Sequence, residues 1–117
     1  MSVETQIVTA LMASPDLSEI KVYPEISHDA KAPYIIYTQI SGTRQTCLRG
    51  DQGLCNPHYQ IDVYATTPKE RSVLSKAVRD ALYASDMTVI FINEGRTWEP
   101  ETKLYRHRQD FSFWNND

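Results

Sequence analysis

Two cysteines and a histidine lie close together in the middle of the chain, and these residue types could do chemistry. Cys47, Cys55 and His58 form a C-x7-C-x2-H pattern. A thiolate beside a histidine base is a nucleophile, and the same groups, with a distant His107, could bind zinc. No known nucleophile motif surrounds either cysteine, and zinc sites favour closely spaced ligand pairs. We therefore interpret both cysteines as hairpin residues and expect no metal or other cofactor.

The acidic side chains that cluster in sequence have simpler explanations than catalysis. His28 and Asp29 are adjacent in a predicted loop, where they are expected to be solvated. Glu94, Glu99 and Glu101 fall between two predicted strands and are interpreted as turn residues.

Two segments suggest nucleic-acid binding, and both lack part of the required pattern. Tyr105-Arg106-His107-Arg108 mixes bases with aromatics, as single-strand binders do, but strand alternation separates the two arginines from the two rings. The segment Gly50–Gly53 fits the G-x-x-G clamp of KH domains. It lacks the flanking helices and contains an aspartate, which repels phosphate.

Length and composition set the frame for these residues. The chain has 117 residues, 12 Lys+Arg against 15 Asp+Glu and a formal charge of −3. This fits one domain spanning residues 1–117. The mild acidity, with a pI near 5.6, argues against a dedicated nucleic-acid binder. The apolar runs are too short for a membrane span, and no signal peptide is expected at the N-terminus.

Periodicity places the elements that must position these residues. Residues 3–13 and the segment from Thr67 to about residue 84 are predicted helices, the second opened by the capping box Thr67-Pro68-Lys69-Glu70. Strands are predicted at 22–24, 34–41, 58–65, 87–92 and 103–114. Residues 43–57 are predicted to form a long, partly flexible hairpin, and Asn93-Glu94-Gly95 a turn.

The order α-β-β-β-α-β-β predicts an α+β fold, with two helices packed on one face of an antiparallel sheet. The other sheet face is then polar and meets water or a neighbouring subunit. Alternation places on it Gln39, Gln60, Asp62, Tyr64, Arg106, Arg108 and Asp110.

Several segments, in this order and spacing, resemble the tail completion (tail terminator, head–tail joining) proteins of tailed phages and prophages. After an N-terminal helix come Val22-Tyr23-Pro24, Ala32–Tyr37, Ile40-Ser41-Gly42, Tyr59–Ala65, a helix beginning near Thr67, Tyr105-Arg106 and Asp110–Trp114. The resemblance implies a non-enzymatic α+β protein that assembles as a ring, a hexamer, at the head-proximal end of the tail tube.

The implied partners are other copies of the chain, the tail tube protein and head–tail connector proteins. The implied location is the host bacterial cytoplasm during assembly and then the virion tail. Subunit or tail contacts are predicted for Gln60, Asp62, Arg106, Arg108, Asp110, Arg44, Arg49 and Asp51. We expect Asp62→Lys to block tail joining without unfolding the chain. The alternative functions are a small nucleic-acid-binding module and a cysteine-dependent enzyme.

Overall fold

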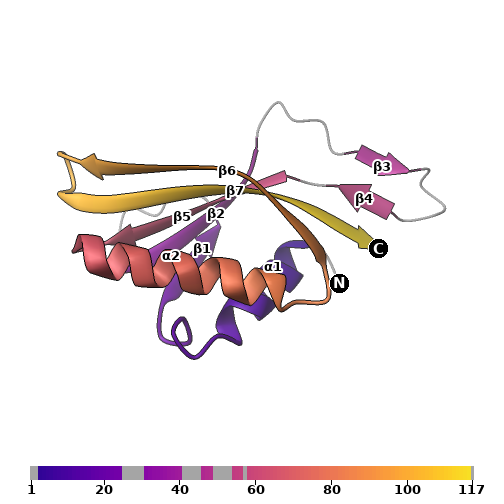
Figure 1. Cartoon of the computed structure of the whole chain (residues 1–117), viewed down its shortest axis with the longest axis horizontal. Coiled ribbons are helices and arrows are strands. Elements are labelled where there is room, and N and C mark those ends of the chain that lie inside the picture. The colour runs from indigo at the N-terminus through magenta and orange to yellow at the C-terminus, as the bar shows by residue number, and fades with distance from the viewer. Residues whose placement is uncertain (1–2, 25–30, 41–45, 49–53, 57, 117) are drawn as a thin grey trace.

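A computed structural model describes residues 3–24, 31–40, 46–48, 54–56 and 58–116 of the chain. Its two helices lie on one side of a sheet, as Figure 1 shows. The predicted α+β class and the order α-β-β-β-α-β-β are confirmed, and the predicted hairpin between the second and third of these strands contains two short strands of its own. None of the helices in the described part of the chain is long and apolar enough to span a membrane.

Both helices form where the sequence predicts them, and each has a local cause. Helix α1 spans Val3–Met12 and buries one apolar stripe, Val3, Ile7 and Leu11. Helix α2 spans Pro68–Tyr83. Its capping box is confirmed, because the Thr67 hydroxyl accepts from the Glu70 N–H at 3.1 Å. The Glu70 carboxylate in turn accepts from the backbone N–H of Thr66 at 2.9 Å.

The sheet has a long C-terminal strand, β7, near its centre, with β5 and β6 as its antiparallel neighbours. Strands β1 and β2 complete one side, and their pairing is parallel, so the sheet is mixed although mostly antiparallel. The strand bounds are Lys21–Pro24 for β1, Tyr34–Gln39 for β2, His58–Ala65 for β5, Thr88–Glu99 for β6 and Leu104–Asn116 for β7.

The predicted hairpin is confirmed in its described part. Strands β3 (Thr46–Leu48) and β4 (Leu54–Asn56) pair antiparallel, with Cys47 opposite Cys55 in the register. Strand β4 also pairs with the end of β7. The segment 49–53, which includes Arg49 and Asp51, lies outside the described residues, and so does Arg44.

The predicted turn at Asn93-Glu94-Gly95 is wrong. These residues lie inside β6, just past a register shift between Phe91 and Asn93. The chain reverses later, at residues 100–103, where Lys103 has a φ of 58°. Gly95 has a packing role instead, because a Cβ there would lie 3.3 Å from a guanidinium nitrogen of Arg108.

The main core lies between the helices and the sheet. Every second side chain of β5 and of β7 points into this core. Its largest fully buried side chains include Phe111, Phe113 and Ile61. A smaller apolar cluster lies on the opposite sheet face, where the rings of Tyr34 and Tyr64 stack at 4.8 Å beside Ile36. Each face of the sheet therefore has buried apolar contacts, but only one has helices over it.

Candidate functional site

Most of the polar side chains predicted for the helix-free face of the sheet come together there. The prediction is wrong for Gln39, because its register partner is Tyr59, a residue of the main core on the helix-covered face. Arg106, Arg108 and Asp110 alternate along β7, and Gln60 and Asp62 alternate along β5. In the register, Asp62 lies opposite Arg108 and Gln60 lies opposite Asp110. We call these five residues the polar face.

An ion pair forms the centre of the polar face. The Arg106 Nε donates to Asp62 Oδ1 at 3.1 Å, and the Gln60 side-chain amide donates to Asp62 Oδ2 at 2.8 Å. The guanidinium also lies over the Tyr64 ring, 5.7 Å from its centroid, and 3.6 Å from a carboxylate oxygen of Glu99. Because the carboxylates of Asp62 and Glu99 both lie beside the Arg106 guanidinium, they compensate its positive charge and disfavour the binding of a phosphate.

Asp62 is less accessible than the sequence predicts. Only 4% of its surface is exposed, and Tyr64 beside it is also buried. A lysine at this position would bury a cation beside Arg106 and leave the guanidinium without its carboxylate partner. The expectation that Asp62→Lys leaves the fold intact therefore does not fit the structure, and a test of this face needs a more exposed residue.

Arg108 is that more exposed residue. Its side chain is 39% exposed and lies 3.7 Å from the Asp110 carboxylate, over the space that Gly95 leaves open. Burial raises the pKa of Asp110, while the guanidinium of Arg108 lowers it.

A hollow of about 520 Å³ lies over the ion pair. It is lined by Ile36, Thr38, Gln60, Asp62, Tyr64, Glu99 and Arg106. The groups in it are carboxylates, a guanidinium, a phenol, a hydroxyl and an amide, which suits the binding of a polar side chain. Across the side chains that the structure describes, no three His, Cys, Asp or Glu residues are grouped so as to hold a metal ion.

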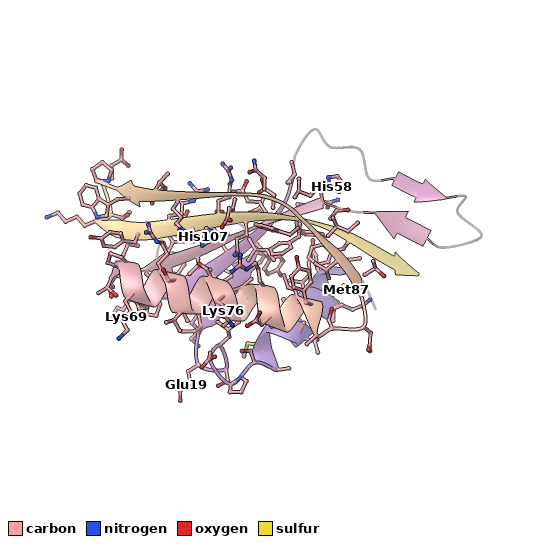
Figure 2. All side chains as sticks on the ribbon, in the orientation of Figure 1. Glu19, His58, Lys69, Lys76, Met87 and His107 are labelled. Carbon is pink, nitrogen blue, oxygen red and sulfur yellow. The ribbon has the colours of Figure 1, made fainter. Side chains whose placement is uncertain are left out.

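The helix-covered face holds a second polar pair that the sequence did not predict. His107 is 1% exposed, and its Nε2 lies 2.6 Å from the Glu94 carboxylate. Figure 2 shows His107 on the sheet above α2. Burial lowers the pKa of His107, although Glu94 opposes that effect. Glu94 is therefore part of a side-chain contact within the sheet and not the turn residue that the sequence predicts.

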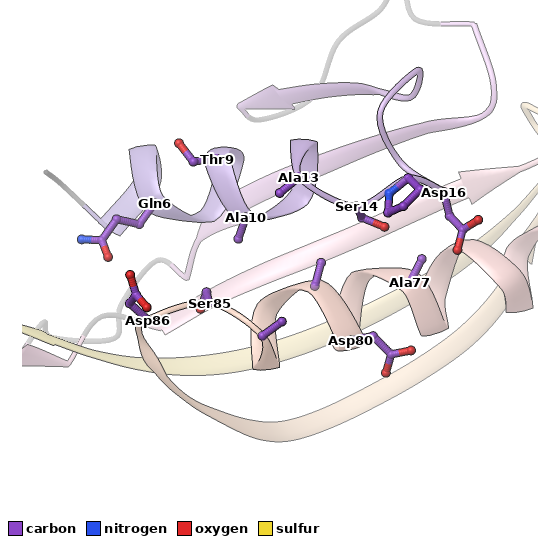
Figure 3. A pocket seen from close by; sticks show the side chains of 13 residues that line it. Gln6, Thr9, Ala10, Ala13, Ser14, Asp16, Ala77, Asp80, Ser85 and Asp86 are labelled. Atoms are coloured by element: carbon purple, nitrogen blue, oxygen red, sulfur yellow. The ribbon is translucent and has the colours of Figure 1, made fainter.

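Sequence reasoning also missed a groove between α1 and α2. Figure 3 shows it, with small side chains from both helices facing one another. Its volume is about 520 Å³, and its lining is Gln6, Thr9, Ala10, Ala13, Ser14, Pro15, Asp16, Ala77, Asp80, Ala81, Ala84, Ser85 and Asp86. The repeated alanines were the available signal, because two facing helices with short side chains leave space between them.

Several predicted residues cannot be placed on either surface. Arg44, Arg49 and Asp51 lie outside the described residues, as do His28 and Asp29. The cysteines are described only by their backbone register in the β3–β4 hairpin.

A comparison with family profiles decides the broad identity of the chain. The profile described as "Tail completion protein gp17" matches residues 5–115. The chain belongs to this family. The resemblance stated from sequence is therefore confirmed, and the tail completion family makes the chain a structural protein of a phage-type virion tail.

A solved structure supports the fold of this tail completion domain. It is titled "Virion of native gene transfer agent (GTA) particle", and one of its chains aligns with a TM-score of 0.68 at 12% identity. The alignment covers 97% of this chain and 93% of that one. At this identity the likeness shows a shared fold. No match is found among curated proteins.

Proposed function

We propose that this tail completion protein forms a ring of six copies that closes the head-proximal end of the tail tube and joins it to the head. It does so without catalysing a reaction and without a cofactor. Its partners are its own copies, the tail tube protein and the head–tail connector proteins, with no specific nucleic acid. It would wait in the host cytoplasm until the tail is assembled.

The observation that most supports this proposal is the family match over residues 5–115, which extends from the first turn of α1 to the end of β7 and misses only the outermost residues of these two elements. A chain this small has its two helices committed to one sheet face. The surfaces available to partners are the polar face and the edges of the sheet. A protein with this organisation is better suited to assembly than to catalysis.

Our proposed subunit or tail contacts are the residues of the polar face, namely Gln60, Asp62, Arg106, Arg108 and Asp110, together with Arg44, Arg49 and Asp51. Exposed polar sheet residues are often simply solvated. The polar face differs from such a surface, because it contains an ion pair with a buried carboxylate, Asp62–Arg106, and a hollow that both residues line. The more exposed pair Arg108–Asp110 lies on the same face. Pre-organised polar groups bind a partner at a lower entropic cost than mobile ones.

The proposal is tested with purified protein, alone and mixed with purified tail tubes, by sedimentation and electron microscopy. We expect rings that cap one end of the tubes. Arg108→Glu should weaken capping, whereas Lys31→Glu, the same charge reversal at an exposed residue outside the polar face, should not. Tubes that stay uncapped at high protein concentration would contradict the ring proposal. Equal capping by both variants would remove the polar face from it.

A further inference from the structure

The tip of the β6–β7 hairpin presents a large aromatic side chain to solvent. Trp98 is 51% exposed in the single chain. Tryptophan is strongly favoured at the energetic centres of protein interfaces. Arg96 precedes it by two residues in the same strand, so the two side chains share a face of the sheet. An exposed Trp with an adjacent cation is a typical interface anchor.

The hairpin tip is fixed to the body of the protein. The Arg71 guanidinium, in the first turns of α2, donates to the Thr97 carbonyl at 3.4 Å and lies over the Tyr105 ring at 5.4 Å. Tyr105 is the register partner of Trp98 across the hairpin. Trp98 therefore lies on a strand that is paired and anchored within its own chain, which lowers the entropic cost of docking.

The groove between α1 and α2 is complementary to Trp98 and Arg96 in shape and charge. Alanines from both helices line it, and its charged lining residues are Asp16, Asp80 and Asp86, with no Lys or Arg among them. Asp80 has a helical partner, Lys76, at 2.8 Å, but this pair is exposed and is weak on that account. The groove suits an apolar side chain with a cation beside it.

Trp98 cannot occupy the groove of its own chain. The tip touches α2 at Arg71, whereas the groove is lined by α2 residues from Ala77 to its C-terminal end. At about 1.5 Å per residue, the helix separates Arg71 from Ala81 by roughly 15 Å. The hairpin tip lies beside the start of α2 (Figure 1), whereas the groove is lined from the middle of α2 onward. Two different surfaces on one chain are what a head-to-tail contact between identical copies requires.

We propose that Trp98 of one copy inserts into the α1–α2 groove of the next copy, with Arg96 facing the aspartates of that groove. This inference rests on the proposed ring and supplies its copy-to-copy contact. The polar face is then available to a tail partner. A tryptophan buries about 150–250 Å², so Trp98 anchors an interface that needs further area around it.

The test uses two variants that each damage one surface. Trp98→Ser removes the anchor, and Ala13→Arg fills the groove and repels Arg96; residue 13 is exposed, so the fold should tolerate the change. Circular dichroism checks folding. Under conditions where the wild type forms rings, we expect each variant to require a roughly 30-fold higher concentration, the usual loss for an interface anchor. Val73→Ser, at an exposed α2 residue outside the groove, is the matched control.

Mixing the two variants gives the sharper result. Trp98→Ser keeps its groove and Ala13→Arg keeps its tryptophan, so together they can make one contact. We expect dimers in the mixture and monomers in each separate sample. Rings formed normally by either variant, or no dimers in the mixture, would overturn this inference while leaving the ring intact. Failure of the wild type to form rings with or without tubes would instead overturn the proposed function.

Discussion

The two faces of strand β7 differ in burial and in charge. Facing the helices, His107, Gln109, Phe111 and Phe113 are all buried. Facing away, Arg106 and Arg108 are only half-buried and hold carboxylates. Apolar packing stabilises the first face, and paired charges organise the second. The difference suggests that one face maintains the fold and the other is available for assembly.

Each face also buries one Asp or His side chain, and the two side chains have different surroundings. On the covered face, burial favours the neutral form of His107. On the polar face, the Asp62 carboxylate accepts hydrogen bonds from the Arg106 guanidinium and from the Gln60 amide. Substitutions on the two faces should therefore differ in size and in their dependence on pH.

The largest effect is expected on the covered face. Phe111→Ala removes a fully buried ring that contacts Phe91 and Phe113. The cavity and the lost transfer energy should lower the free energy of unfolding by about 3–5 kcal/mol. Urea denaturation measures this, with Val73→Ala on the exposed side of α2 as the control. A loss below 1 kcal/mol would mean that the helices do not cover a rigid core.

An intermediate effect is expected at the polar face. Asp62→Asn keeps the shape of the side chain but removes the charge that pairs with Arg106. We expect a loss of about 1–3 kcal/mol, the usual cost of leaving a buried partner unsatisfied. The same denaturation assay measures it. If the variant is as stable as the wild type, the ion pair does not organise this face.

The pH dependence should separate the two faces further. The pKa of His107 is lowered in the folded protein, so on acidification the unfolded chain takes up this proton first. The free energy of unfolding should therefore fall as the pH drops below about 6.5. His107→Gln should reduce that fall, measured between about pH 7.5 and 5.5. An unchanged pH dependence in this variant would show that His107 is not held neutral.

The smallest effect on stability is expected from Arg108→Ala. The side chain is more than a third exposed, and its ion-pair distance to Asp110 is 3.7 Å, so the free energy of unfolding should change by no more than about 0.5 kcal/mol. Tail capping should nevertheless decrease. A variant that loses stability and keeps capping would reverse the roles assigned to the two faces.

Much of the fold could be predicted because its signals are local. The capping box fixes the start of α2, and the alternation in His58–Ala65 gives the bounds of β5. The glycine of Asn93-Glu94-Gly95 misled the prediction, because glycine occurs where another side chain approaches closely, here Arg108, as well as in turns. The parallel β1–β2 pair depends on long-range contact and has no local signal.

The candidate site was predicted only in part. Alternation correctly placed Gln60, Asp62 and Arg106 on one face. It cannot show that Asp62 is buried, or that the Arg106 guanidinium pairs with Asp62 and lies over the Tyr64 ring. The α1–α2 groove arises from two helices that are distant in sequence. The alanines of each helix are visible in the sequence, but whether they face one another across a groove depends on how the helices pack.

The most direct test of the account is electron microscopy of particles from the host that encodes this chain, with its coding sequence deleted. The account predicts separate heads and unterminated tails, with joined particles restored by the wild-type chain and by Lys31→Glu but reduced with Arg108→Glu. Normal, joined particles made without the chain would contradict its central claim.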